Sequence, residues 1–556
     1  MTEYKSPGEH WDYHYDWWSY NKEIMQDFNW FLYKINQRAC INLGYLDETY
    51  EEVLTAILPQ EMYYQRALDF SESNPFTGLI PFGFGAARQL TAFDIAFDFF
   101  YKTSSSENIS FVQEVFEKLQ ENGHIYEKEI IQFFCENDQK FLPDRFVKGT
   151  CPYCDAEEQY SDLCEKCGRI PEEIDNPHCS ICGEKPENKS TNHYFFKLKN
   201  FSEPLLDYLT NAPYLQKDVK KYVENWIKEG LVDWDITRDI SWGVPIPIEG
   251  LKDKVFYGWF DNHLAYISST LKFLKDKNID GKNFWNDADI YHFIGKDIVY
   301  HHYLFLPAMR LGIDKEFKLP DYIPTRGHLT LEGKKISKSR NWYIGLKDFL
   351  ETFPADYLRF YLISINPYSQ DDLNFDWEQF STKINSELIG NLGNLINRAL
   401  GFTNKAFDGV IPEPEDFDEK DSESEEKIKS LANDVGKLMQ ENHLDRALKQ
   451  LMEFSAHFNQ YFQHKEPWKK GPGTNTCIYL SANAVRSLAI CLHSFLPKSS
   501  QKIWSQLGLE GNVSDIQWSE MSSLVLKPGD KIGVVEPIFS KIEQSVIDEQ
   551  QSKLGK

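Results

Sequence analysis

Apolar positions along the chain change from strand-like to helical spacing, which predicts an α/β region followed by a helical one. Short apolar runs alternate with helical segments between about residues 93 and 331, and Asp261, Gly295 and Asp297 follow such runs. This alternation predicts a parallel sheet whose ligand lies beyond the carboxyl ends of its strands. These three residues are therefore candidates for a ligand site.

Beyond residue 340 the apolar spacing is helical. Helices are expected over 356–363, over 378–406, along a stripe from Leu444 to Phe458, and over about 477–495. Stripes of this kind indicate an antiparallel helical bundle with an apolar core. The acidic, proline-bearing segment 411–426 is interpreted as a solvated surface linker.

One short loop carries the clearest candidate chemistry. A strand-like segment runs through Gly333 into Lys335, Ser337, Lys338 and Ser339. A loop with two ammonium groups and two hydroxyls can close on a polyphosphate and offset the charge that builds on its leaving oxygens. The alternative is a solvated, lysine-rich surface turn.

The cysteines indicate metal binding. Cys151, Cys154, Cys164 and Cys167 form two CxxC pairs nine residues apart, a spacing that aims four thiolates at one tetrahedral ion. A third pair, Cys179 and Cys182, has no partner pair in the sequence. It either joins a second site with His178 or His193 or exchanges roles with another pair. In each case we expect a structural zinc closed by protein ligands.

Composition limits the classes of function. The 556 residues are 41% hydrophobic, enough for several domains, and the net charge of −25 with a pI near 5.1 argues against indiscriminate nucleic-acid binding without excluding tRNA. No apolar run reaches the roughly 18 to 20 residues that span a bilayer, and the acidic, aromatic N-terminus is unlike a signal peptide. Cysteines concentrated in CxxC pairs fit a reducing compartment, so a soluble, cytoplasmic protein is expected.

From about Phe93 to Leu496 the chain resembles methionyl-tRNA synthetase, a class I aminoacyl-tRNA synthetase. The resemblance rests on ordered motifs, namely the run from Phe141 to Pro152, the cysteine knuckles, Asp235 to Asp239, His292 to Tyr300, Lys335 to Ser339, and Pro467 with Trp468. It implies an α/β fold: a Rossmann-like catalytic domain with an inserted zinc-knuckle connective domain, followed by an all-α anticodon-binding bundle. The expected divisions are 1–90 of unknown role, 91–135 and 233–340 for the Rossmann halves, 136–232 for the connective domain, 341–385 for a stem-contact region, and 386–556 for the bundle.

The resemblance also assigns roles to individual residues. It implies ATP-dependent activation of an amino-acid carboxylate as an acyl adenylate, with transfer to tRNA and with Mg²⁺ bridging the phosphates. Lys335 and Lys338 would act on the pyrophosphate, and Gly295, Asp297, Ser337 and Ser339 would bind the nucleotide. The amino-acid pocket would comprise Trp259, Asp261, Asn262, His263, Tyr266, Ile298 and His302, while Asn394, Arg398 and Trp468 would read the anticodon. Without the resemblance, the alternative is that Tyr266, Ile298 and His302 are core residues, that Trp468 is a buried bundle residue, and that Asn394 and Arg398 are exposed helix positions.

Two features depart from the family pattern. The HIGH signature that grips ATP is not found in residues 1–90. In the amino-acid pocket, Asn262 and His263 follow Asp261 where the family usually has Ala-Pro or Ala-Leu, and Leu306 stands where the family has a tryptophan. Added polar groups in an apolar pocket need partners, so the preferred amino acid is expected to be a polar one rather than methionine.

Three functions therefore remain open: a diverged synthetase, a paralogue that ligates an activated amino acid to another small molecule, and a catalytically silent tRNA-binding protein. A partner subunit that completes the nucleotide site also remains open.

Overall fold

The structure is a computed structural model that describes residues 93, 94, 99, 103–142, 146–161, 173–240, 243–251, 254–337 and 340–555. The chain divides into two compact units, the first made of residues up to 323 and the second of residues from 324 onward together with 92–95 and 294–296. The region 1–90 lies outside the described residues. The six-part division expected from the sequence stays a prediction.

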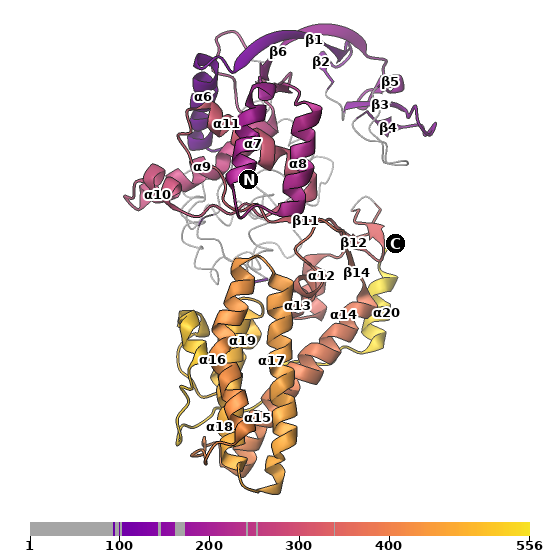
Figure 1. Cartoon of the computed structure of the whole chain (residues 1–556). Coiled ribbons are helices and arrows are strands. Elements are labelled where there is room, and N and C mark those ends of the chain that lie inside the picture. Colours follow the sequence, from indigo (N-terminus) through magenta and orange to yellow (C-terminus); the bar gives the residue numbers. More distant parts are fainter. Residues whose placement is uncertain are drawn as a thin grey trace, which may run out of the picture. The chain divides into compact units, whose positions relative to one another are not determined.

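A long antiparallel pair of strands dominates one side of the first unit (Figure 1). Strand β1 (Ile125–Cys135) pairs with β6 (Glu187–Phe196) along almost its whole length, in a sheet of order β2-β1-β6-β7 with β2 at Lys140–Phe141 and β7 at Trp234–Asp235. At the far end of the pair lies a small sheet of order β4-β3-β5, made of Gln159–Tyr160, Val147–Thr150 and Asp175–Cys179. The cysteine-rich segment therefore forms a small module with a sheet of its own.

Helices and short strands make up the rest of the first unit. The predicted helix with apolar positions Val112, Val115, Phe116 and Leu119 is confirmed, and all four side chains are buried. The elements are α6 (Ser106–Glu121), η2 (Leu198–Phe201), α7 (Ser202–Asn211), α8 (Lys217–Glu229), β8 (Thr237–Arg238), β9 (Val255–Phe256), α9 (Gly258–Asp276), α10 (Gly281–Asp287), η3 (Lys296–Ile298), η4 (His301–Phe305) and α11 (Leu306–Gly312).

Parallel strands occur at the start of the second unit. Strand β10 (Ile294–Gly295) pairs in parallel with β11 (Thr325–Arg326), and β12 (Leu329–Leu331) pairs in parallel with β14 (Leu373–Phe375) and antiparallel with β13 (Lys334–Lys335). Parallel strands joined through helices are what the alternating pattern predicts.

The remainder of the second unit is helical, as predicted, and its largest part is a bundle of α15 to α19 (Figure 1). Buried residues of α17 and α18 form much of its core. The elements are α12 (Leu346–Thr352), α13 (Ala355–Ser364), α14 (Trp377–Lys383), η5 (Ile384–Gly393), α15 (Asn394–Ala406), α16 (Glu419–Gln440), α17 (Leu444–Lys465), η6 (Pro467–Lys469), α18 (Thr474–Leu492), α19 (Pro497–Gln506), η7 (Val513–Asp515), η8 (Trp518–Ser522) and α20 (Gln544–Ser552).

The prediction of a solvated linker over 411–426 is wrong at both of its ends. Ile411 is buried, and α16 begins at Glu419 behind a capping box formed by Asp418 and Asp421. Asp421 is itself buried, where it accepts a hydrogen bond from Tyr461 and pairs with Lys465. The acidic residues here serve to start a helix.

Among the described residues, every helix is too short or too polar to cross a lipid bilayer.

Candidate active site and metal centre

One face of α9 carries three of the residues assigned to the amino-acid pocket. Trp259, His263 and Tyr266 are spaced four and three residues apart, so they share a face of the helix. Phe260, Leu264 and Ile267 point into the core and fix the rotation of α9. The aromatic face is therefore held in place by packing on the other side of the helix.

The short π-helix η4 places two histidines against this face. The ring of His302 lies 5.1 Å from that of His263 and 5.8 Å from that of Tyr266, measured between centroids. The ring of His301 lies 4.4 Å from Trp259 and 5.5 Å from His263. Neither His301 nor His292, whose ring stands 4.4 Å from Tyr266, was assigned from the sequence. Only the short distances between their rings and those of α9 identify them as pocket residues.

Hydrogen bonds fix the protonation of His302. Its Nδ1 lies 3.1 Å from the carbonyl oxygen of Ile298, which can only accept, so Nδ1 carries the proton. Its Nε2, 3.2 Å away, accepts from the hydroxyl of Tyr266. Burial lowers the pKa of His302 to about 4, and the imidazole is neutral. This chain of bonds sets the orientation of Tyr266.

Two further ionisable side chains in this pocket carry buried atoms that lack hydrogen-bond partners among the described residues. Both ring nitrogens of His263 are buried without a hydrogen bond, and so is Oδ1 of Asp261. Burial lowers the pKa of His263 well below its usual value and raises the pKa of Asp261 to about 7. Neutral imidazoles beside a carboxyl group of raised pKa, set among aromatic side chains, suit the binding of a small polar ligand.

The two other residues expected in the amino-acid pocket are less buried than His263: Asn262 is exposed on α9, and Ile298 is half-buried. Asp297, which is expected to bind the nucleotide, is exposed in η3. Leu306, at the position of the family tryptophan, is fully buried at the start of α11.

The lysine loop is a hairpin in the second unit, built by β12 and β13. Lys335 is exposed and pairs with Thr330 in the ladder, and Ser337 exchanges two backbone hydrogen bonds of 2.9 Å with Trp342. Lys338 and Ser339 lie outside the described residues. Within the described chain, the ammonium group of Lys335 forms no ion pair. An exposed cation of this kind is available to a phosphate.

The sequence did not single out Trp342, which anchors this hairpin. Its indole Nε1 donates to the carbonyl oxygen of Leu331 at 2.8 Å, and Lys334 places its ammonium group 4.1 Å from the ring centroid. The glycine before β12 is also required, because a Cβ at Gly327 would overlap the carbonyl oxygen of Asp371. Gly295, on β10 in the same unit, pairs with Arg326.

The motif from Asp235 to Asp239 is tied to β6 by a buried histidine. His193 contacts Asp235 through Nδ1 at 2.7 Å and Asp239 through Nε2 at 2.8 Å, and Lys254 also pairs with Asp239. Burial disfavours the imidazolium, but the two carboxylates outweigh it and raise the pKa of His193. His193 is thus an ion-pair residue and does not ligate a metal.

Cys179 and Cys182 lie with Cys135 and Asp138 in a group whose donor atoms could hold a metal ion. The expectation that His178 or His193 completes this site is wrong, since His178 faces Glu158. The sulfur of Cys135 lies 3.4 Å from that of Cys182, and an oxygen of Asp138 lies 3.3 Å from Cys135 and 3.1 Å from Cys179. Thiol hydrogen bonds from Cys182, Cys179 and Cys135 lower the pKa of Asp138.

The dimensions of this cluster suit a tetrahedral zinc ion. With Zn–S bonds of about 2.3 Å, ligand atoms stand about 3.8 Å apart, and these four atoms all lie within 4.8 Å of one another. Three sulfurs and a carboxylate are a donor set that zinc accepts. The four residues therefore fit the metal.

The first pair of the other predicted site is also formed. Cys151 is buried and Cys154 half-buried, and a turn in which Asp155 donates to the Cys151 carbonyl at 3.0 Å brings them together. Cys164 and Cys167 lie outside the described residues, so the four-cysteine site stays a prediction.

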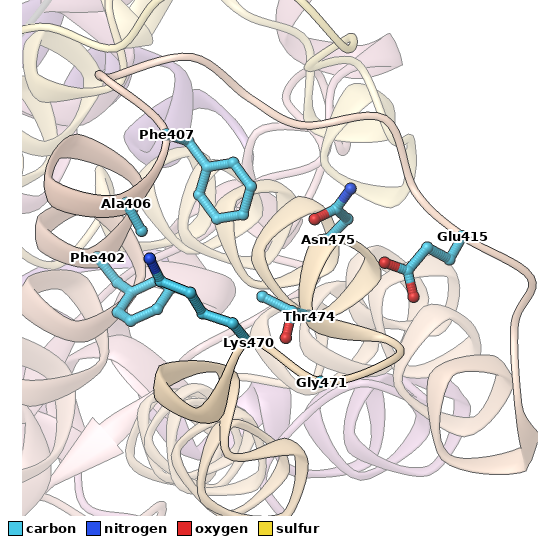
Figure 2. Close-up of a pocket in the computed structure, with 8 residues that line it drawn as sticks. All are labelled: Phe402, Ala406, Phe407, Glu415, Lys470, Gly471, Thr474 and Asn475. Carbon is cyan, nitrogen blue, oxygen red and sulfur yellow. The ribbon is translucent and has the colours of Figure 1, made fainter.

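The residues expected to read an anticodon lie on α15 and η6 of the bundle. The amide of Asn394 donates to Asn459 at 2.9 Å, Arg398 is half-buried, and Trp468 is 44% exposed with its ring 6.4 Å from that of Phe462. Further along these elements is a cavity of about 230 Å³. Figure 2 shows its lining of aromatic and polar side chains, which comprises Phe402, Ala406, Phe407, Glu415, Lys470, Gly471, Thr474 and Asn475.

Comparison with known proteins places the whole of this arrangement in one family. Residues 85–400 match the family described as tRNA synthetases class I (M), and residues 411–556 match the anticodon binding domain of methionyl tRNA ligase. The methionine–tRNA ligase of Methanopyrus kandleri is 41% identical over 478 residues, covering 84% of this chain and 70% of that protein. That of Pyrococcus furiosus is 41% identical over 475 residues, covering 82% of this chain and 64% of its own length.

A solved structure agrees on the fold. Mycobacterium tuberculosis methionyl-tRNA synthetase bound by methionyl-adenylate superposes with a TM-score of 0.69 at 22% identity, over 86% of this chain and 90% of that one. The predicted fold class, a class I synthetase catalytic domain followed by a helical anticodon domain, is thereby confirmed. The chain belongs to the methionyl-tRNA synthetase family of class I aminoacyl-tRNA synthetases.

Proposed function

We propose that this protein activates an amino acid with ATP and transfers it to tRNA. The observation that carries the proposal is that one chain joins a class I catalytic region to a methionyl-type anticodon domain. Relatives that are 41% identical are methionine–tRNA ligases, so methionine is the amino acid to test first.

The chemistry needs charge stabilisation more than proton transfer. The amino-acid carboxylate attacks the α-phosphorus of ATP, the bond to the bridging oxygen breaks, and pyrophosphate leaves with its electron pair. Lys335, exposed on β13 of the hairpin, would offset charge on the departing pyrophosphate together with Lys338 and the hydroxyls of Ser337 and Ser339. A ribose hydroxyl of tRNA then attacks the acyl carbon and releases AMP.

Bound ions would support this reaction in two different ways. Mg²⁺ would supply positive charge to the phosphates of ATP, while Gly295 and Asp297 would contact the nucleotide. Zinc held by Cys135, Asp138, Cys179 and Cys182 would fix the module at the end of β1 and β6. A site closed by four protein ligands leaves no position for a reacting water.

The bundle would supply tRNA recognition. Single-stranded bases are bound by stacking on aromatic rings and by hydrogen bonds to their edges, which suits the exposed ring of Trp468 on η6 and the polar side chains of Asn394 and Arg398 on α15.

Amino-acid-dependent exchange of pyrophosphate into ATP, followed by tRNA charging, tests the proposal. Exchange with methionine and charging of its tRNA are expected. Exchange without charging would point to ligation of another acceptor, and the absence of exchange with retained tRNA binding would point to a silent binding protein. Light scattering on the active fraction decides whether a second subunit completes the nucleotide site: activity in a fraction that holds this chain alone argues against one.

A further inference from the structure

The pocket at α9 contains three uncharged imidazoles, and one of them has two buried ring nitrogens without a hydrogen-bond partner among the described residues. His263, His301 and His302 surround Trp259 and Tyr266, and all three are buried or half-buried. His302 uses both ring nitrogens on Ile298 and Tyr266. His263 uses neither of its own on a described residue, although it is 1% exposed.

A buried polar group without a partner weakens the fold unless a ligand supplies the partner. A metal ion does not explain His263, because within the described chain the only cluster with metal-ligand spacing is that of Cys135, Asp138, Cys179 and Cys182. An ion pair does not explain it either, since its neighbours are the neutral His301 and His302 and the indole of Trp259. Because no described residue pairs with these nitrogens, we take an uncharged group of a bound molecule as their partner.

Neutral imidazole offers one N–H donor and one acceptor nitrogen. Burial and the neighbouring histidines keep His263 in this form, with its pKa well below the usual value. The N–H side can bond a thioether sulfur or an oxygen, whereas a methylene group in the same place leaves it unpaired. Sites built on such a bond reject analogues that lack the bonding atom.

We propose that His263 is a specificity-determining residue that donates a hydrogen bond to a heteroatom in the side chain of the bound amino acid. The inference rests on the proposed function, and it names the substrate class as amino acids with an acceptor atom in the side chain, methionine among them. His263 shares its face of α9 with Trp259 and Tyr266, so the ring is held at the pocket wall by helix geometry.

Binding of methionine and of norleucine to the full chain tests the inference. Norleucine has a methylene in place of the sulfur, so the ratio of their Kd values isolates the heteroatom. By calorimetry the wild-type protein should bind methionine roughly 10-fold more tightly, the effect of one unsatisfied donor. His263→Leu should bring the ratio close to 1, and His263→Gln, which keeps an N–H, should restore part of it.

The ratio compares two ligands on one variant, so a general loss of stability cancels, and circular dichroism confirms that each variant folds. Equal ratios in wild type and His263→Leu, or the binding of neither amino acid, would overturn the inference. Selective binding without pyrophosphate exchange would contradict the proposed function and leave the role of His263 standing.

Discussion

His193 offers the sharpest test of how the Asp235–Asp239 motif is held. Replacement by leucine removes a fully buried imidazole and both of its contacts to Asp235 and Asp239. Hydrogen bonds between charged partners contribute about 1.5–3 kcal/mol each, which suggests roughly 3–6 kcal/mol for the pair. Lys254 and Arg238 still neutralise the carboxylates, so we expect a loss near the lower end, about 3 kcal/mol.

The loss should depend on pH. The pKa of His193 is raised above 6.5, so its contribution is complete below about pH 6.5 and declines as pH rises through that raised value. The pKa of Asp239 is lowered below 3.8 by His193 and Lys254 despite burial, so its contribution is present above that value and lost as pH falls through the lowered pKa. His193→Leu should therefore cost most between about pH 5 and 6.5 and least near pH 9.

Thermal melts at pH 6 and pH 9 provide the assay. A domain of this size shifts by about 2–4 °C for each kcal/mol, so a fall of roughly 6–12 °C is expected for the transition of the first unit at pH 6. His178→Gln is the matched control, because His178 is only half-buried beside an exposed Glu158 and should shift the transition by less than about 2 °C. A shift at pH 6 no larger than that of the control, or one that does not depend on pH, would refute the reasoning.

Three further predictions concern other parts of the chain. Cys179→Ser should lower the zinc content by one equivalent in elemental analysis, and unchanged content would rule out the site at Cys135 and Asp138. Trp342→Ala removes a hydrogen bond and a cation–π contact that together contribute roughly 1–3 kcal/mol. Limited proteolysis should therefore cut the lysine hairpin of the variant faster than that of the wild type, while the bundle stays resistant. Equal cleavage rates would contradict the anchoring role. Trp468→Ala should weaken tRNA binding roughly 10-fold without changing pyrophosphate exchange. The control Lys449→Ala, at an exposed position on α17, should leave binding unchanged. Undiminished tRNA binding by the Trp468→Ala variant would argue against stacking on Trp468.

Periodic spacing was sufficient to predict most of the helices. The apolar stripe from Leu444 to Phe458 is the buried face of α17, and the run predicted over 477–495 corresponds to α18. Composition alone misplaced 411–426, because acidic residues favour solvated linkers but also start helices. Asp418 and Asp421, three residues apart and followed by Ile428 and Leu431, are the capping signal that identifies the helix.

The cluster of Cys135, Asp138, Cys179 and Cys182 could not be predicted because its members are far apart in sequence. Cys135 ends β1, Asp138 lies in the turn after it, and Cys179 ends β5, so only the antiparallel pairing of β1 with β6 and of β3 with β5 brings them together. A CxxD pair is also not a recognised knuckle. His263 was found through its departure from the family pattern, while His301 and His292 needed the turn of η4 to place them beside α9.

If the exposed lysine hairpin serves adenylate formation, ATP–pyrophosphate exchange with methionine measures its contribution directly. We predict that the wild-type chain catalyses exchange, that alanine at both Lys335 and Lys338 lowers its rate at least about 100-fold, and that Lys541→Ala, an exposed lysine near the C-terminus, has no effect. Undiminished exchange in the double variant, or no exchange by the wild-type chain with any amino acid, would contradict the account.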